Sequence, residues 1–154
     1  MPQLVKGGKY VFGWSIIRIN GDIIIPDEAY LEYGFINDEK AILMSGSKKS
    51  GGFGLSSKRL LSDTPIGKSL TKYPDLLNYK INEGEIKKIN NRIFSWVNIK
   101  KEKSFKLTEN LLDAFNIKMN KKLLVARGSG LALGFIASGP IYEEAKKHPE
   151  ILTF

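Results

Sequence analysis

The sequence contains no cysteine, and its only histidine is His148. Without cysteine the chain cannot form disulfide bonds or thiolate metal sites, and one imidazole provides too few ligands for a zinc site of the usual kind. We therefore predict no metal and no cofactor, and we interpret His148 as a packing or surface residue.

Long apolar runs are also absent. No stretch of 18 consecutive apolar residues occurs, and Met1–Gly7 lacks the apolar core of a signal peptide. We therefore expect a cytoplasmic protein without a membrane partner. Hydrophobic residues make up 42% of the chain and charged residues 26%, which is typical of a globular protein.

Acidic residues are fewer than basic ones: 16 Asp and Glu stand against 24 Lys and Arg, so the net charge is +8. The basic excess is spread over both halves of the chain, and there is no basic tail. Such a surface attracts polyanions such as nucleic acid. Many lysine-rich proteins are basic without binding nucleic acid, so the placement of the charges matters more than their number.

An internal repeat is present. Residues 13–56 align without a gap on residues 95–138, at an offset of 82 residues. In this alignment Trp14 falls on Trp96 and Phe53 on Phe135, and the apolar pattern agrees throughout. A repeat of this kind indicates one structural unit used twice.

A second aligned block closes each copy. Tyr73–Tyr79 matches His148–Phe154 at an offset of 75, because the first copy has additional residues around 61–70. We interpret the chain as a tandem duplication, with a first repeat at 10–79, a linker at 80–91 and a second repeat at 92–154.

Each copy is predicted to have the order β-β-α-β-β. In the first copy we expect strands at 10–19 and 22–25, joined by Asn20-Gly21, a strong two-residue hairpin signal. Pro26 suits the first position of a helix that ends at a left-handed Gly34. Residues 41–44 and 53–55 are predicted strands.

The second copy repeats this order with different residues. We expect strands at 94–100, 104–107, 123–126 and 131–136, followed by a short helix at 141–147. Thr108 is the predicted N-cap of the central helix, Leu111, Leu112 and Phe115 form its apolar stripe, and Asn116 is its left-handed end.

A unit this small buries little surface by itself, so we expect the two copies to interlock around one shared core. We predict that the two tryptophans and the pair Phe53 and Phe135 belong to this core rather than stacking on nucleic-acid bases. The linker is polar, although Ile86 and Ile89 could pair at a sheet edge.

The segment Gly21–Ala29, with the short helix that ends at Gly34 and the apolar strand at 41–44, resembles the AbrB/MazE/SpoVT family of DNA-binding proteins. In that family two chains, each giving one β-β-α-β-β half, form a swapped-hairpin barrel. The resemblance covers about 45 residues of the first copy, and the second copy is similar through the repeat. It implies a mainly β fold with short helices: a pseudo-two-fold, swapped-hairpin AbrB-like β-barrel built from the two repeats.

The resemblance also implies a function. The chain would be a DNA-binding transcription regulator with double-stranded DNA as its partner, and a homodimer or a protein partner is also possible. Family members present basic residues of the first hairpin to DNA, and the matching positions are Arg18, Lys100, Lys101 and Lys103. Where the family often has arginine after the hairpin glycine this chain has Asp22, and an acid there repels phosphate.

Two glycine-rich turns, 45–52 and 127–130, occupy equivalent places in the two copies. Such turns can present backbone N–H groups to an anion. We therefore add Lys48, Lys49 and Arg127 to the candidate DNA-binding residues. The alternative is a tight β-connection that needs glycine for backbone reasons, and neither turn matches the phosphate-loop pattern.

No pair of acidic residues recurs at equivalent places in the two copies, so we predict no catalytic residues and no enzyme. The alternative to DNA binding is an AbrB-like barrel that acts as a protein-interaction or small-ligand module. Asp22 and the divergent second hairpin favour this alternative, whereas the distributed positive charge favours DNA binding.

Overall fold

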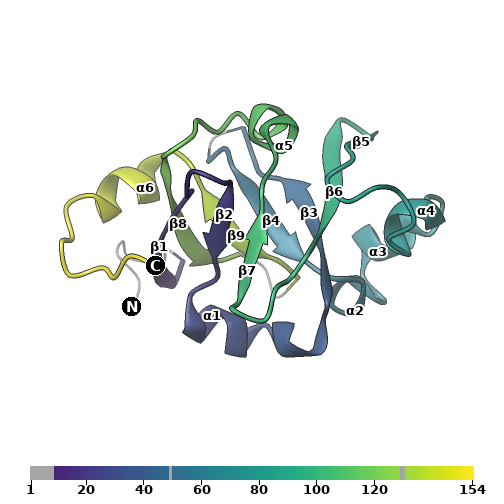
Figure 1. The fold of residues 1–154 in the computed structure, drawn as a ribbon, viewed down its shortest axis with the longest axis horizontal. Helices are drawn as coiled ribbons and strands as arrows, with labels where there is room; N and C mark the ends of the chain where they lie inside the picture. The colour runs from purple at the N-terminus through teal and green to yellow at the C-terminus, as the bar shows by residue number, and fades with distance from the viewer. Residues whose placement is uncertain (1–8, 49, 129–130) are drawn as a thin grey trace.

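The structure is a computed structural model, and it describes residues 9–48, 50–128 and 131–154. Within these ranges the fold is mainly β with short helices, as predicted from the sequence. One antiparallel sheet contains, in spatial order, β1 (Val11–Ile16), β8 (Lys122–Arg127), β9 (Leu133–Ile136), β4 (Phe53–Ser56), β3 (Lys40–Ser45), β6 (Arg92–Asn98) and β5 (Lys87–Ile89). Two further strands, β2 (Asp22–Ile24) and β7 (Ser104–Lys106), form a separate antiparallel ribbon in front of this sheet (Figure 1).

The two halves of the chain exchange strands. β1 pairs with β8 of the C-terminal half, and β6 pairs with β3 of the N-terminal half. Trp14 lies opposite Leu124, and Trp96 lies opposite Ile42, which are equivalent positions at the offset of 82. The register of the exchanged strands therefore follows the sequence repeat.

Two strand pairs bring equivalent residues face to face. Ile23 of β2 lies opposite Phe105 of β7, and Phe53 of β4 lies opposite Phe135 of β9. All four side chains are buried in one cluster, and the rings of Phe53 and Phe135 stack with their centroids 4.8 Å apart. Burying a phenylalanine contributes about 1.5–3 kcal/mol, so this contact between the halves is a large part of the core.

Two short helices flank the ribbon on opposite sides, α1 (Asp27–Glu32) with the adjoining turn η1 (Phe35–Asn37), and α5 (Glu109–Ala114) (Figure 1). Thr108 caps α5 by accepting a hydrogen bond from the Leu111 N–H at 3.3 Å, as predicted. Gly34 and Asn116 end the two helices with φ of 68° and 56°, which also matches the prediction. Every described helix is too short and too polar to cross a lipid bilayer.

The first hairpin differs from the two-residue turn predicted at Asn20-Gly21. The Arg18 N–H donates to the Asp22 carbonyl, and the Gly21 N–H donates to the Arg18 carbonyl. Gly21 has a φ of 88°, whereas Asn20 has no positive φ. This is a three-residue turn with a glycine bulge. The Gly21 carbonyl accepts from the Leu107 N–H, so contact with the other half of the chain selects this turn.

The linker predicted at 80–91 is partly a strand. β5 pairs with β6, and Ile89 is buried, so the edge-pairing alternative describes this segment better than a solvated linker. Asn90 and Asn91 turn the chain between the two strands with φ of 51° and 66°, which is the backbone of a tight hairpin.

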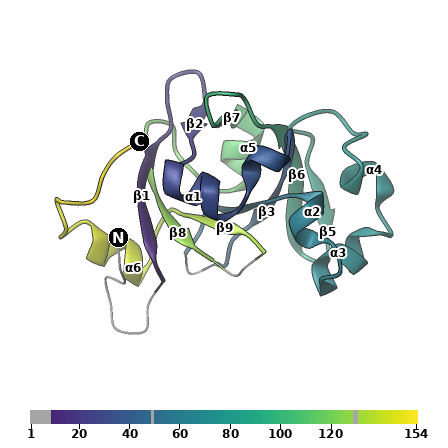
Figure 2. The same cartoon turned by 90° about the horizontal axis from the view of Figure 1, so that it is seen from below.

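Helices cover two flanks of the large sheet on the face turned away from the ribbon. The first flank has α2 (Lys58–Leu61), α3 (Pro65–Leu70) and α4 (Pro74–Leu77), packed on Ile42, Met44 and Phe94. The second flank has α6 (Pro140–Ala145), packed on Trp14 and Leu124. Figure 2 shows these two groups of helices at opposite ends of the molecule. At the offset of 75 residues α3 falls on α6, and each of these helices has six residues and begins at a proline. The additional residues of the first copy therefore precede α3, where α2 lies.

Candidate anion-binding surfaces

The first candidate surface is the outer face of the β2–β7 ribbon with its two turns, 18–21 and 100–103. Ile23 and Phe105 point into the core and are fully buried. Because successive strand residues point to opposite faces, Asp22 and Lys106 face outward. These two residues lie opposite each other in the register, and Lys106 is exposed.

The two turns lie at opposite ends of the ribbon. At one end the Leu107 N–H donates to the Gly21 carbonyl at 2.9 Å, and at the other end the Ile25 N–H donates to the Lys103 carbonyl at 2.8 Å. Gly21 and Ile25 are four residues apart along an extended strand, a span of about 13 Å at roughly 3.3 Å per residue. The structure therefore places the hairpin cations at two separate ends and not in one cluster.

Two of the predicted DNA-binding lysines form ion pairs with acids of the first copy. Lys100 Nζ lies 3.0 Å from Asp22 Oδ1, and Lys103 Nζ lies 3.0 Å from Asp27 Oδ1. Lys103 Nζ also lies 5.4 Å from the centroid of the Tyr30 ring. The negative charge of Asp22 is thus compensated inside the protein, and Lys100 is occupied by the same contact.

Three other cations of this surface, Arg18, Lys101 and Lys106, are exposed and form no ion pair with any residue in the described ranges. Arg18 and Lys106 lie at one end of the ribbon, because Lys106 pairs with Asp22 beside the turn at 18–21, and Lys101 lies at the other end. Sequence analysis missed Lys106, although strand alternation around an apolar Phe105 would have placed it on the outer face.

The second candidate surface, which we name the β4–β9 groove, lies on the opposite face of the large sheet. β4 and β9 are central strands, yet Gly54 and Gly134, which pair with each other, are only half-buried. They form the floor of a hollow of about 200 Å³ between the two helical flanks. Its walls come from both glycine-rich turns and include Lys9, Ser45, Gly46, Ser47, Ser50, Gly51, Arg92, Gly128, Leu131 and Ala132.

The described residues of the turn at 45–52 are held by hydrogen bonds within the turn and by the end of β9. The Ser50 N–H donates to Ser47 Oγ at 3.1 Å, and the Ser50 carbonyl accepts from the N–H groups of Ala137 and Ser138 at 3.0 and 2.9 Å. Gly52 has a φ of 68°, and a Cβ there would lie 1.9 Å from the Phe135 carbonyl oxygen. Position 52 therefore requires glycine for the backbone, which agrees with the interpretation of this turn as a tight β-connection.

The basic residues of the glycine-rich turns differ in position. Lys48 is exposed on the turn, whereas Lys49 and the Ser129-Gly130 part of the second turn lie outside the described residues. Arg127 donates two hydrogen bonds to the Glu32 carboxylate, at 2.6 and 2.5 Å, and stacks 4.7 Å from the Tyr10 ring centroid. The contact with Glu32 raises the pKa of Arg127, and it connects β8 to α1.

Arg92 and Lys9 are the cations that line the groove, and sequence analysis identified neither. Arg92 Nε donates to the Ser45 carbonyl at 3.3 Å, which holds the guanidinium at the base of the glycine-rich turn. This contact exists because β6 pairs with β3, a long-range exchange between the two halves. The residues next to Arg92 in the sequence do not predict its contact with Ser45.

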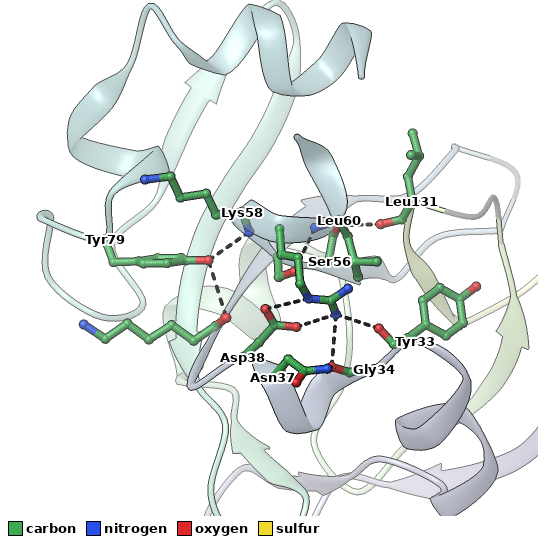
Figure 3. Close-up of polar contacts among 12 residues, drawn as sticks. Tyr33, Gly34, Asn37, Asp38, Ser56, Lys58, Leu60, Tyr79 and Leu131 are labelled. Atoms are coloured by element: carbon green, nitrogen blue, oxygen red, sulfur yellow. Dashed lines mark hydrogen bonds and ion pairs between the residues drawn. The ribbon is translucent and has the colours of Figure 1, made fainter. Parts of the chain in front are cut away.

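A larger hollow, of about 720 Å³, lies elsewhere, between η1 and α2, and is lined by Asn37, Asp38, Glu39, Lys40, Lys58, Arg59, Ser62 and Tyr79. Its polar groups bond to one another (Figure 3). Arg59 donates to both oxygens of Asp38, at 3.3 and 2.8 Å, and to the carbonyls of Tyr33 and Gly34 at 2.8 and 3.0 Å. Arg59 therefore caps the end of α1 and joins it to α2, which is a structural role.

Tyr79 belongs to the same network. Its hydroxyl accepts from the Lys58 N–H at 3.0 Å, and burial raises its pKa. Lys40 Nζ lies 5.0 Å from the Trp96 ring centroid, and Lys122 Nζ lies 4.3 Å from that of Trp14. Both tryptophans are buried, Trp14 at 3% exposure and Trp96 at 6%, but neither lies in the shared central cluster as predicted. Trp14 packs beneath α6, and Trp96 packs against Tyr79, because both side chains point to the face of the sheet that the helices cover.

Comparison with known proteins assigns neither a family nor a function to this chain. The sequence matches no protein-family model and no curated protein. Function must therefore be argued from the charges and geometry of the ribbon and the groove.

Proposed function

We propose that this chain binds double-stranded DNA through the outer face of the β2–β7 ribbon and acts as a transcription regulator of the AbrB-like type. The observation that carries the proposal is the placement of Arg18, Lys101 and Lys106. These exposed cations stand at the two ends of one ribbon, Arg18 and Lys106 at one end and Lys101 at the other, outside the ion pairs that occupy Lys100 and Lys103.

The strand exchange supports the family resemblance on which the proposal also rests. Each repeat, 10–79 and 92–154, gives one strand to the other's hairpin, and equivalent residues meet at Ile23–Phe105 and Phe53–Phe135. We propose that the two repeats form, in one chain, the swapped-hairpin barrel that the AbrB-like family builds from two chains.

The dimensions of the ribbon suit duplex DNA. The major groove is about 12 Å wide and admits a two-stranded β-ribbon. The two turns of this ribbon are about 13 Å apart by the strand rise, so Arg18 and Lys101 can reach phosphates on the two walls of one groove. Lys106, at the same end as Arg18, then faces the same groove. Phosphate contacts of this kind position the protein and dominate its affinity.

The ion pair between Asp22 and Lys100 reduces the repulsion that the sequence predicts between Asp22 and DNA phosphate. An unpaired acid on a DNA-facing strand repels phosphate. Here Lys100 compensates Asp22 at 3.0 Å, and the three remaining cations outnumber the exposed Glu102 of the turn at 100–103, so the ribbon keeps a positive balance. The two ends of the ribbon carry different residues, so we expect a DNA site with imperfect two-fold symmetry.

The test is the binding of a fluorescently labelled random-sequence duplex at several salt concentrations. Wild-type affinity should fall steeply with salt, and the triple variant Arg18→Ala, Lys101→Ala, Lys106→Ala should lower the slope of log K against log salt by up to about 2.7, since each phosphate contact contributes about 0.9. The matched control is Lys72→Ala, Lys80→Ala, Lys88→Ala, which removes the same charge from exposed lysines near α4 and β5. Absence of duplex binding at low salt would remove the proposal and leave the small-ligand or protein-interaction alternative.

A further inference from the structure

We propose that the β4–β9 groove is a binding site for a phosphate-bearing small molecule of about mononucleotide size. The phosphate would lie against Ser47 and Ser50, near Arg92 and Lys9, and the organic part would lie in the adjoining hollow over Ile66 and Phe94. This site is separate from the ribbon, because the two surfaces lie on opposite faces of the large sheet.

The charges of the groove favour an anion. Among the residues that the structure describes, no Asp or Glu lines the hollow over Gly54 and Gly134 or the adjoining hollow, and Arg92 contributes to both. Within the described residues Arg92 forms no ion pair, and its one side-chain hydrogen bond uses Nε. A guanidinium has five N–H donors, so four remain for a ligand. Arginine suits phosphate because its planar donors bind two oxygens at once.

The shape of the groove suits a ligand with an apolar part. The second hollow, of about 220 Å³, adjoins the first at Ile66 and Arg92, and its lining contains Leu70, Ile89 and Phe94 beside Ser69 and Asn90. Ligand sites of roughly 300–1,000 Å³ combine an apolar lining with a few polar groups. The two hollows together reach the lower part of that range, which fits a mononucleotide or a sugar phosphate.

The glycines of the floor keep the groove open. Glycine in a central strand weakens a sheet and often marks a close approach of a ligand or another backbone. A Cβ at Gly54 would lie 3.2 Å from the Cβ of Ala132 in the opposite wall, so any larger side chain at 54 would occupy the hollow. The groove therefore combines free space over its glycine floor with two cations, Lys9 and Arg92, and a lining without carboxylates among the described residues.

The experiment is isothermal titration calorimetry of the full chain at low salt with AMP, ribose 5-phosphate, pyrophosphate and, as the uncharged control, adenosine. We expect at least one phosphate compound to bind with a dissociation constant below about 1 mM, an affinity of roughly −4 kcal/mol, and adenosine to bind more weakly. Arg92→Gln should weaken that binding at least tenfold, and Gly54→Val should abolish it. Arg18→Gln, on the ribbon, is the matched control and should leave it unchanged.

Two results would overturn this inference. One is that none of the three phosphate compounds binds to the wild-type chain, whose folding is checked by its thermal transition. The other is that Arg92→Gln weakens binding of the labelled duplex but of no small molecule, which would assign the groove to the DNA backbone. Because Gly54→Val can disturb folding, Arg92→Gln, whose side chain is exposed, is the decisive variant. Neither result depends on whether the ribbon binds DNA.

Discussion

Lys103 and Gly21 occupy the same position of the two hairpins, and both have a left-handed backbone, with φ of 64° and 88°. The hydrogen bonds of the two turns also match: Lys100 N–H to Ser104 carbonyl and Lys103 N–H to Lys100 carbonyl repeat those of the first hairpin. A side chain in this backbone region costs about 1 kcal/mol that glycine avoids. The second hairpin therefore keeps a turn whose geometry glycine fits better than lysine does.

The first prediction concerns this strain. Lys103→Gly should be more stable than Lys103→Ala by about 1 kcal/mol in urea unfolding, because both remove the contacts with Asp27 and Tyr30 and only glycine relieves the left-handed backbone. The control pair is Lys106→Gly and Lys106→Ala in β7, where an extended backbone should reverse the order. Equal stability of the two Lys103 variants would show that the turn stores no strain.

Much of the fold follows from local pattern, and the rest does not. Thr108, Gly34 and Asn116 mark helix ends because capping depends on the residue itself. Local pattern did not predict the three-residue turn at Gly21, because this turn contacts Leu107 in the other half of the chain. It also did not settle whether Ile89 lies in a strand, because that depends on pairing with β6.

The same distinction holds for the candidate sites. Sequence reasoning located Arg18 and Lys101, which lie on turns where exposure is the default. It could not show that Lys100 and Lys103 pair with acids about 80 residues away, or that Arg92 joins the glycine-rich turn, because these contacts depend on the strand exchange.

The second prediction compares two glycines with left-handed backbones. Gly52→Ala should destabilise the protein by more than about 3 kcal/mol, because its Cβ would lie 1.9 Å from the Phe135 carbonyl oxygen and the paired central strands would have to move. Gly84→Ala should cost only about 1 kcal/mol, since its φ is 81° but the nearest atom, Thr108 Cγ2, is 3.5 Å away. Chemical denaturation measures both values. A similar cost at the two positions would contradict the close approach at Gly52.

The third prediction tests whether the halves share one core. The chain has two tryptophans, so Trp14→Phe leaves Trp96 as the fluorescent probe and Trp96→Phe leaves Trp14. In each variant the tryptophan fluorescence and the far-ultraviolet circular dichroism should report the same urea midpoint, because Phe53, Phe135 and the exchanged strands join the halves. Separate midpoints in either variant would indicate two independent units.

The fourth prediction uses the only histidine. Hydrogen bonds to Glu150, at 2.8 Å, and to Glu144 raise the pKa of His148 above its usual 6.5. The protonated ring is thus favoured in the folded state, so its contribution to stability is complete below pH 6.5 and is lost as the pH rises through the folded pKa. The carbon-bound imidazole protons of the one histidine give this pKa directly in an NMR titration. His148→Gln should flatten the stability profile in that range, and an unshifted pKa would exclude the contact.

The last prediction returns to the ion pair between Lys100 and Asp22. Asp22→Asn removes the acid and frees Lys100, so affinity for the labelled duplex should rise about five- to tenfold at ~0.1 M salt, and the salt slope should increase by about 0.9, the value of one phosphate contact. Stability should change by less than about 1 kcal/mol, because the pair lies at the surface. Glu85→Gln is the matched control, since it removes an acid paired with Lys87, at 4.0 Å, away from the ribbon. If both variants raise affinity equally, net charge explains the effect, and Asp22 has no special place on a DNA-binding face.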